Sequence, residues 1–372
     1  MNDIHAEAFA SEPLEAFGWS DRWAALFGAV ASDDADRYPG RVIRADRGSV
    51  LVATTRGLER AEPSAALRRQ AGSPFDLPAT GDWLSLRRPD RHDITLIDAV
   101  LPRTSAFTRG DPGETSVAQV LAANVDVMFV VQPLAGDPNL RRIERELALS
   151  WESGAVPVVV LTKADLSADP EAARSAVERI AFGVDVVLTS ALSGDGVESV
   201  AAYAATGATV AFIGPSGCGK STLINAVLGH ERQATREVRV GDGKGRHTTV
   251  TRELIPLPGG GVLMDTPGMR AVAVHDLDEG LDAAFPDIVE RAQRCRFRDC
   301  EHRDEPGCAV TAAVAEGGLP AERLASYHKL QREAVVAAMK TDARLRAEEV
   351  RKWKIIHKSA RDHDKRNGRF RP

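Results

Sequence analysis

The sequence predicts an α/β protein in three parts: a central domain built on a parallel sheet, a small β-barrel before it and a helical module after it. Three observations predict this fold class. Short β-rich runs separated by Gly, Pro and Asp fill residues 41–100, as in a small barrel. Strand-sized apolar runs then alternate with helical stretches up to residue 264, which indicates a parallel sheet covered on both faces. After about residue 280, strand-like runs cease and Cys, His and charged residues dominate.

Length and composition agree with a multidomain globular protein. The chain has 372 residues, 43% of them hydrophobic and 27% charged, which favours two or three domains and excludes collagen-like, fully disordered and coiled-coil chains. The longest apolar runs, 156–161 and 208–213, are far shorter than the roughly 20 apolar residues of a membrane span. The first 13 residues lack the basic-then-apolar pattern of a signal peptide. We therefore expect a cytoplasmic monomer without a membrane partner.

Charge is distributed unevenly along the chain. The net charge of −5 argues against a general nucleic-acid binder, yet residues 1–40 hold eight acids against two bases, and residues 351–372 hold nine Lys and Arg against two acids. This asymmetry predicts an acidic N-terminal arm over residues 1–38 and a basic C-terminal tail over residues 351–372. The tail either contacts a polyanion or is a solvated, disordered terminus, and charge alone favours neither.

Residues 39–113 are expected to form a barrel similar to the OB fold. About five short strands in a segment of this length are typical of such barrels. Four of them are visible as β-rich runs, at 41–44, 49–55, 82–86 and 93–100. The segment has 12 Arg and no Lys against nine acids, so it could bind an oligonucleotide, although the pattern suits any small barrel equally.

Residues 114–280 are expected to form the central α/β domain. Its strands are expected at 125–131, 156–161, 185–188, 209–213 and 262–264, with helices at 139–153, 170–182 and 197–204. Because such alternation gives a parallel sheet, the loops that follow the strands should gather at one edge, where ligands of open α/β sheets bind.

The strongest motif begins where the strand 209–213 ends. Residues 214–222 match the phosphate-loop pattern G-x-x-x-x-G-K-[ST] in full, and a helix-like run follows them. Backbone N–H groups of such a loop close around phosphates, Lys220 would reach the β- and γ-phosphates, and the Ser221 hydroxyl would ligate Mg²⁺. The binding residues expected here are Gly214, Pro215, Ser216, Gly217, Cys218, Gly219, Lys220, Ser221 and Thr222. Cys218 is interpreted as a small loop residue without a redox role.

Two further loops predict which base the nucleotide carries. The tetrapeptide after the strand 156–161 looks like the [NT]-K-x-D element that reads guanine in GTPases; it consists of Thr162, Lys163, Ala164 and Asp165. The Asp165 carboxylate can accept hydrogen bonds from guanine N1–H and its exocyclic amine, whereas adenine offers no such donor pair. The tripeptide after the next strand resembles the S-A-x element that supports the base; it consists of Ser190, Ala191 and Leu192. The alternative is that T-K-A-D is an ordinary loop.

The strand 262–264 is followed by a loop that resembles the D-x-x-G element of GTPases, residues 265–268. Asp265 would hold Mg²⁺ through water, and the Gly268 N–H would contact the γ-phosphate. The Gly-rich stretch 240–249 lies between this loop and the phosphate loop. Either Thr248 or Thr249 could close onto Mg²⁺ as a first switch does, and the sequence does not decide between them.

A cysteine-rich segment predicts a metal site in the helical module, residues 281–350. The pattern Cys295-x4-Cys300-x-His302-x5-Cys308 supplies three thiolates and one imidazole. Such a closed tetrahedral set suits one structural Zn²⁺, which binds thiolate and imidazole groups, rather than a catalytic ion. Five arginines surround these ligands, so the segment either contacts RNA phosphates or is a solvated surface; they are Arg291, Arg294, Arg296, Arg298 and Arg303.

The order of the motifs is unusual. A conventional GTPase has the phosphate loop first, then the switch threonine, D-x-x-G, N-K-x-D and S-A-x, whereas here T-K-A-D and S-A-L precede the phosphate loop. The motif set is therefore complete but circularly permuted. With L-P-R-T-S at 101–105 and G-R-H-T-T at 245–249, the chain resembles the ribosome small-subunit-dependent GTPase A family of bacterial ribosome-assembly GTPases. The resemblance covers the barrel, the permuted GTPase domain and the zinc module.

The resemblance implies slow GTP hydrolysis, stimulated by the small ribosomal subunit, during late maturation of that subunit and in contact with its rRNA. Met269 follows Gly268 where many GTPases have a water-orienting Gln, and a thioether cannot orient water. His247 is our candidate catalytic residue, because imidazole can accept a hydrogen bond from water near neutral pH, with Lys220 acting on the phosphates. The alternative is that His247 is a loop residue or an RNA contact.

Two other functions remain possible from the sequence. One is a P-loop nucleotide kinase or ATPase with an accessory zinc module, which would need a substrate-phosphate pocket and no guanine reader. The other is an RNA-binding scaffold with a vestigial GTP site, which the intact Lys220, Ser221 and Asp265 disfavour.

Overall fold

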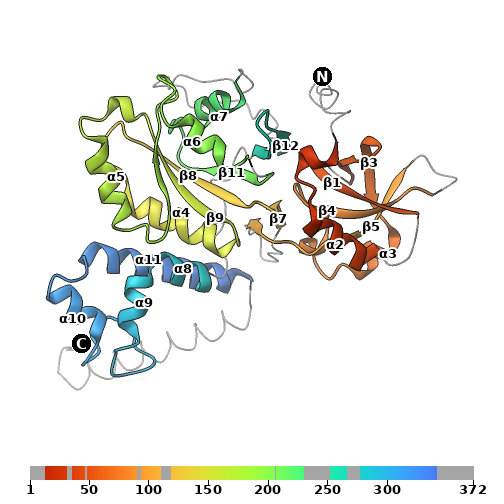
Figure 1. The fold of residues 1–372 in the computed structure, drawn as a ribbon. Helices are drawn as coiled ribbons and strands as arrows, with labels where there is room; N and C mark the ends of the chain where they lie inside the picture. Colours follow the sequence, from red (N-terminus) through yellow and green to blue (C-terminus); the bar gives the residue numbers. More distant parts are fainter. Residues whose placement is uncertain are drawn as a thin grey trace, which may run out of the picture.

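The computed structural model of the chain describes residues 13–31, 36–46, 48–89, 94–109, 119–205, 207–229, 252–265 and 277–341. Figure 1 shows the three predicted parts in chain order: a barrel, a central sheet with helices on both faces, and a group of C-terminal helices. The predicted fold class is confirmed. None of the helices in these described ranges is long and apolar enough to cross a membrane.

The N-terminal barrel is closed in the strand order β1-β2-β3-β5-β4, with β3 and β5 parallel. Its strands are β1 (Arg37–Ala45), β2 (Val50–Thr54), β3 (Gly57–Pro63), β4 (Trp83–Arg87) and β5 (Thr95–Val100). Apolar side chains such as Val42, Val52 and Ile97 fill the interior. Between β3 and β4 lie α3 (Ala65–Gln70), which Ser64 caps, and the 3₁₀ turn η2 (Pro74–Asp76).

The described part of the N-terminal arm packs on the barrel. It forms the 3₁₀ turn η1 (Leu14–Phe17) and α2 (Asp21–Ala31). Phe17 is fully buried, and the rings of Trp19 and Trp23 lie 5.0 and 5.7 Å from that of Trp83. Aromatic burial of this kind holds the segment against β4.

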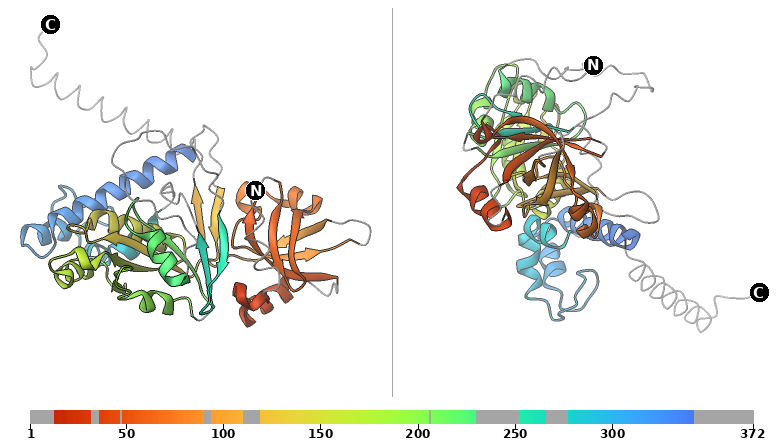
Figure 2. Two further views of the ribbon diagram at one scale, coloured as in Figure 1. Left: turned by 90° about the horizontal axis from the view of Figure 1, so that it is seen from above. Right: turned by 90° about the vertical axis from the view of Figure 1, so that its right-hand side faces the viewer.

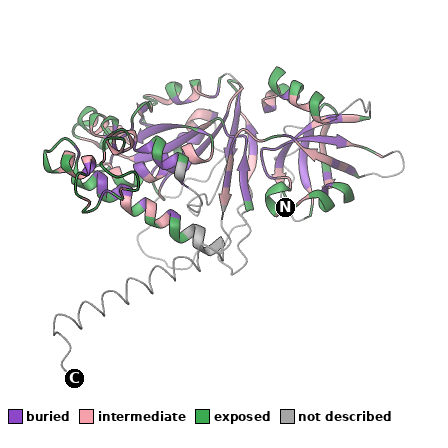
Figure 3. Ribbon diagram, turned by 90° about the horizontal axis from the view of Figure 1, so that it is seen from below, coloured by how far each residue is buried: buried purple, intermediate pink, exposed green. Residues whose placement is uncertain are grey.

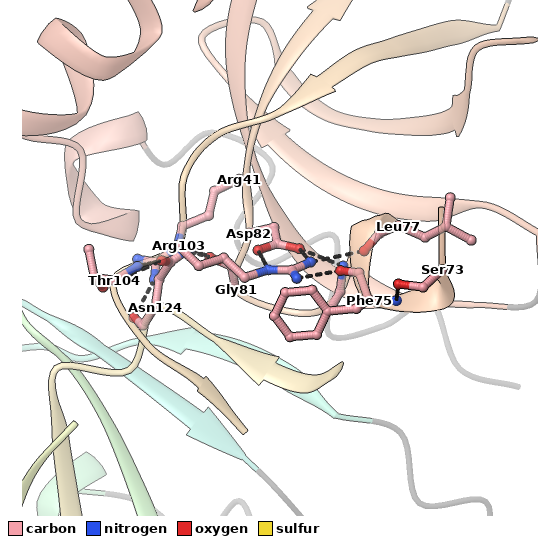
Figure 4. A network of polar contacts seen from close by, with 10 residues as sticks. Arg41, Ser73, Phe75, Leu77, Gly81, Asp82, Arg103, Thr104 and Asn124 are labelled. Carbon is pink, nitrogen blue, oxygen red and sulfur yellow. Dashed lines mark hydrogen bonds and ion pairs between the residues drawn. The ribbon is translucent and has the colours of Figure 1, made fainter. Parts of the chain in front are cut away.

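A buried arginine joins the arm, the barrel and the sheet. The Arg41 guanidinium donates to Thr209 Oγ1 at 2.7 Å and to the carbonyl oxygens of Phe17, Gly81 and Asn124. Burial lowers the pKa of Arg41 to about 10. Its hydrogen bonds to these acceptors offset part of the free-energy cost of removing the guanidinium from water. Figure 4 shows Arg41 beside Gly81 and Asn124.

A second arginine, half-buried, fixes the exit from the barrel within the L-P-R-T-S segment. Arg103 binds Asp82 with two N–H···O bonds of 2.7 Å and donates to the carbonyl oxygens of Phe75 and Leu77 (Figure 4). Asp82 has no exposed surface, and its burial raises the pKa of its carboxyl, which the Arg103 charge opposes. This fork-to-fork contact ties β4 to the start of the linker.

The central sheet has six strands in the order β10-β9-β8-β11-β13-β12, parallel except for the edge strand β12. The strands are β8 (Val127–Pro133), β9 (Val156–Thr162), β10 (Val186–Leu188), β11 (Thr209–Ile213), β12 (Glu253–Pro256) and β13 (Val262–Asp265). An antiparallel pair, β6 (Ala106–Arg109) and β7 (Gln119–Ala123), connects the barrel to this sheet.

Helices cover both faces of the sheet, and Figure 3 shows buried strands between more exposed helices. On one face, Met128 and Val130 pack with Ile143 of α4 (Leu140–Glu152), and α5 (Pro170–Glu178) lies near β10. On the other face, Phe129 and Val131 pack with α6 (Val197–Ala202) and α7 (Lys220–Leu228). The alternation along β8 follows from the two-residue repeat of a strand.

The C-terminal helices dock on α4. They are α8 (Asp278–Ala284), α9 (Pro286–Ala292), α10 (Ala309–Ala315) and α11 (Ala321–Thr341). On α8, the Gly280 N–H donates to Glu152 at 2.8 Å, and a Cβ at Gly280 would lie 2.2 Å from the Ala148 carbonyl oxygen. On α11, the buried Arg323 pairs with Glu144 at 2.9 Å and with Asp287 at 2.7 Å. Figures 1 and 2 show α8 and α11 alongside the central domain, with the barrel at the opposite end.

Candidate functional site

Three of the predicted nucleotide loops lie at one edge of the sheet. The phosphate loop follows β11, T-K-A-D follows β9 and S-A-L follows β10, and these strands are parallel. Their carboxyl ends therefore point the same way, and β8 lies between the strands that carry the first two loops. The site occupies the edge where ligands bind in open α/β sheets.

The predicted phosphate loop runs from the end of β11 to the first residue of α7. Gly214, Gly217 and Gly219 have φ angles of 151°, 74° and 97°, which only glycine adopts readily. A Cβ at Gly214 would lie 2.3 Å from the Val131 carbonyl oxygen. The loop curls around the Lys220 ammonium, which donates to the carbonyl oxygens of Gly214 at 2.8 Å and Pro215 at 2.7 Å.

The remaining loop residues differ in exposure. Cys218 is fully buried, whereas Ser216 and Thr222 are exposed. Ser221 is half-buried in the first turn of α7. The first N–H groups of a helix lack intrahelical partners, so this turn presents donors and positive partial charge toward the loop.

The T-K-A-D loop contacts the phosphate loop directly. The Thr162 hydroxyl donates to the Cys218 carbonyl oxygen, and Lys163 Nζ donates to the Gly217 carbonyl oxygen at 2.8 Å. Lys163 has a φ of 58°, which turns the chain into the short 3₁₀ helix η3 (Ala164–Leu166). Asp165 is exposed in this helix, where its carboxylate is open to a ligand.

The S-A-L loop forms a turn closed by Ser190. The Ser190 hydroxyl accepts a hydrogen bond from the Ser193 N–H at 3.3 Å. The backbone N–H of Ser190 donates to the Asp195 carbonyl oxygen at 3.0 Å. Ser190 is buried and Ala191 half-buried, whereas the Leu192 side chain is 89% exposed. The strands β9 and β10 are adjacent, and the Ala164 N–H donates to the Thr189 carbonyl oxygen at 3.1 Å, so this turn lies beside T-K-A-D.

The predicted switch residues lie mostly outside the described part of the chain. His247, Thr248, Thr249 and Gly268 fall in ranges that the structure does not describe. Asp265 is the last residue of β13, and its side chain is not described.

The structure adds two polar residues that the sequence motifs did not indicate. Gln132, at the end of β8, donates to the Glu146 carboxylate of α4 at 3.0 Å, and both side chains are buried. Burial raises the pKa of Glu146 to about 7, opposed by the Gln132 hydrogen bond and the charge of Lys220. Two weak signals for this pair were available in the sequence. Glu146 directly precedes the apolar Leu147 in the predicted helix, and Gln132 directly follows a predicted apolar strand.

The four predicted zinc ligands come together in the helical module. The ligand atoms of Cys295, Cys300, His302 and Cys308 all lie within 4.8 Å of one another. His302 Nδ1 is 3.6 Å from the sulfurs of Cys295 and Cys308, which are 3.9 Å apart. Zn–S bonds of about 2.3 Å in a tetrahedron place sulfurs about 3.8 Å apart, so this cluster fits zinc.

The arginines around this cluster are partly engaged within the module. Arg294 pairs with Glu290 at 3.0 Å and Arg303 with Glu301 at 3.3 Å. Arg291 donates to the carbonyl oxygens of Asp287 and Gly318, while the Arg296 guanidinium lies 5.4 Å from the ring of the exposed Phe297. An exposed aromatic ring beside a guanidinium is a surface suited to stacking with a nucleobase.

Comparisons with known proteins agree with these features. A family model for the RsgA GTPase matches residues 100–275. A protein of Streptomyces coelicolor, the Small ribosomal subunit biogenesis GTPase RsgA, is 46% identical over 344 residues, or 92% of this chain and 92% of that protein. A protein of the same name from Opitutus terrae is 43% identical over 366 residues, or 96% of this chain and 99% of that protein.

Solved structures show the same architecture. YjeQ from Thermotoga maritima has a TM-score of 0.60 at 27% identity, over 80% of this chain and 99% of that one. YloQ, described as a circularly permuted GTPase, has a TM-score of 0.57 at 23% identity, over 81% of this chain and 96% of that one. The second likeness concerns the fold alone, and it matches the permuted order of motifs found here.

Proposed function

Since this chain belongs to the RsgA GTPase family, whose members hydrolyse GTP, we propose that it binds the small ribosomal subunit and its rRNA and hydrolyses GTP during late maturation of that subunit, stimulated by the subunit itself. The names of its relatives support the subunit as the partner. The kinase or ATPase alternative is not favoured, because the chain matches GTPases over nearly its whole length.

The contact between T-K-A-D and the phosphate loop carries the proposal. Lys163 and Thr162 bind the backbone of that loop, so the groups proposed to read guanine and to hold phosphate form one unit. In this proposal Asp165 accepts the guanine donors and Ser190, Ala191 and Leu192 support the base. Lys220 offsets the charge of the phosphates, and the Ser221 hydroxyl holds Mg²⁺ with Asp265 and one of the two threonines.

Hydrolysis requires a water molecule in line with the γ-phosphate. We assign its orientation to His247, because Met269 replaces the usual Gln and cannot accept a hydrogen bond of that strength. Gly268 would contact the γ-phosphate through its N–H. A poorly held water gives slow intrinsic turnover, which agrees with activation by a bound subunit.

The other segments are proposed to bind RNA or to support that binding. The layout is an arm over 1–38, a barrel over 39–113, the GTPase domain over 114–280, the zinc module over 281–350 and a tail over 351–372. One Zn²⁺ held by Cys295, Cys300, His302 and Cys308 would fix the loop between α9 and α10. The arginine and phenylalanine side chains of that loop and the basic tail would contact rRNA.

Hydrolysis of GTP and of ATP, each with and without small ribosomal subunits, tests the proposal. We expect subunits to stimulate GTP hydrolysis alone. Lys220→Ala is the control for contaminating hydrolases, since it removes the phosphate-binding ammonium. A preference for ATP, or turnover indifferent to subunits, would contradict the proposal and favour a metabolic P-loop enzyme.

A further inference from the structure

A buried polar pair lies beneath the two nucleotide loops, and none of the motifs includes it. Gln132 is 2% exposed and Glu146 is 8% exposed, and the Gln132 amide donates to the Glu146 carboxylate at 3.0 Å. Their neighbours Val130, Ile143 and Leu147 are apolar and buried. Because a buried carboxylate costs free energy that an apolar side chain would not, the pair calls for an explanation beyond packing.

The main chain at Gln132 supports both loops. Its carbonyl oxygen accepts from the Thr162 hydroxyl at 3.4 Å, and the same hydroxyl donates to Cys218 in the phosphate loop. Two residues on, the Leu134 N–H donates to the Thr162 carbonyl oxygen at 2.8 Å. On the other side of β8, the Val131 carbonyl oxygen lies against Gly214 so closely that no Cβ fits. The end of β8 is thus the common support of T-K-A-D and the phosphate loop.

Three cations act on the Glu146 carboxylate: Arg142 and Arg145 on its own helix, and Lys220 from the phosphate loop. From the C-terminal helices, Arg323 and Glu333 of α11 pair with Glu144 and Arg145 of α4. On α8, Gly280 contributes its backbone N–H to Glu152. Lys220 is also the ammonium proposed to bind phosphates, so an ionised Glu146 and a bound nucleotide attract the same charge.

We propose that Glu146 and Gln132 are positioning residues of the nucleotide site. Their hydrogen bond fixes the end of β8, and with it the spacing between T-K-A-D and the phosphate loop, while the ionised Glu146 carboxylate attracts Lys220 away from the phosphates. The inference rests on the nucleotide-binding roles proposed above. Burial raises the pKa of Glu146 to about 7. Below that pH the group is neutral and Lys220 is fully available, so nucleotide affinity falls as the pH rises through 7.

The test is a fluorescence titration of the full-length protein with methylanthraniloyl-GDP and Mg²⁺ at pH 6 and pH 8. Glu146→Gln keeps the shape and an acceptor for Gln132 but carries no charge. We expect it to bind about threefold to tenfold more tightly than the wild type at pH 8, and equally at pH 6. Ionisation of the nucleotide phosphates affects both proteins alike and cancels in this ratio. Glu146→Ala leaves the Gln132 amide unpaired, and we expect about tenfold weaker binding than the wild type at pH 6, where both proteins lack the charge. At pH 8 the loss of the carboxylate charge offsets most of this difference.

Glu178→Gln, which neutralises an exposed carboxylate on α5, is the matched control. It should bind the labelled GDP with wild-type affinity at both pH 6 and pH 8. Thermal unfolding without nucleotide checks that each variant is folded. The same ratio of Glu146→Gln to wild type at both pH values, or wild-type affinity in Glu146→Ala at pH 6, would overturn the inference while the wild type still binds GDP. Failure of the wild type to bind GDP would instead overturn the proposed nucleotide site, and this inference with it.

Discussion

At the scale of single residues, Asp165 is the side chain on which the choice of base depends. Its carboxylate is exposed at the sheet edge and offers two acceptor oxygens to guanine. We predict that Asp165→Asn lowers GDP affinity by roughly tenfold to a hundredfold and leaves ADP affinity unchanged, because an amide group would face guanine donors with a donor of its own. Competitive titration with unlabelled GDP and ADP measures both affinities.

Glu171→Gln is the control for that prediction. Glu171 is an exposed carboxylate six residues after Asp165, and the substitution removes the same charge at a position away from the base. An unchanged GDP-to-ADP ratio in Asp165→Asn would mean that another group reads the base.

Arg103 makes a contact with Asp82 that even the conservative change to lysine should disrupt. It binds Asp82 through two parallel N–H···O bonds, and Asp82 is fully buried. Lysine cannot form this fork, so we predict that Arg103→Lys lowers the free energy of unfolding by about 2–3 kcal/mol. Urea unfolding followed by tryptophan fluorescence measures it, because Trp83 lies in the adjacent strand position. The exposed Arg88→Lys should shift stability by less than about 0.5 kcal/mol, and an equally small loss in Arg103→Lys would contradict the prediction.

At the scale of elements, the contact between α8 and α4 depends on a glycine. Gly280 has no room for a Cβ beside the Ala148 carbonyl oxygen, whereas a Cβ at Gly28 in the exposed face of α2 meets nothing within 4 Å. We predict that Gly280→Ala destabilises the protein by about 1–3 kcal/mol. The matched change Gly28→Ala should stabilise it by up to about 1 kcal/mol, because alanine favours helix. Thermal unfolding of both variants measures these changes in stability. Equal changes in the two variants would show that α8 does not pack against α4 as described.

The elements also show which parts of the fold a sequence can predict. The strand at 209–213 was predicted with its observed bounds, because a threonine and four apolar residues lead directly into a distinctive glycine motif. The strand β3 was not identified, since three of its seven residues are charged, namely Glu59, Arg60 and Glu62, and only Ala61 is buried. β2 precedes it across a tight turn, but its formation also depends on pairing with β5, which lies more than 30 residues further along the chain and which no local pattern reveals.

The same distinction holds for the site. Residues within a motif, such as those of the phosphate loop, could be assigned from the sequence because their spacing is fixed by the backbone. The pair of Gln132 and Glu146 could not, because it joins a strand to a helix that packs on it, and either residue alone reads as an ordinary polar position. The coupling of Lys163 to Gly217 likewise exists only once β9 and β11 lie on either side of β8.

At the scale of the whole molecule, the zinc module and the GTPase domain should be separable. The four ligands lie between α9 and α10, while Arg323 holds α11 to α4 without contacting the cluster. We predict that Cys300→Ala abolishes stoichiometric zinc binding and reduces helical content, because three donors do not close a tetrahedral site. GDP affinity should stay within about twofold of the wild type, as expected for distant, independent sites. Zinc analysis, circular dichroism and nucleotide titration measure these three effects.

Cys300→His is the matched variant, since imidazole is an alternative zinc ligand, and it should retain the metal. Loss of GDP binding in Cys300→Ala would mean that the module and the GTPase domain fold as one unit.

The order of strands in the central sheet also has a consequence for biosynthesis. β8, β9 and β10 are adjacent in space and leave the ribosome first, but the other side of β8 is covered only by β11, some 80 residues later in the chain. During translation, therefore, the nascent domain exposes unpaired N–H and C=O groups along one edge of the apolar strand β8 until residues 209–213 emerge. In a chain with the conventional motif order, the strand that precedes the phosphate loop would be synthesised before the other strands of the sheet. The permuted gene order thus lengthens the interval in which this edge of a partly synthesised chain is open to aggregation.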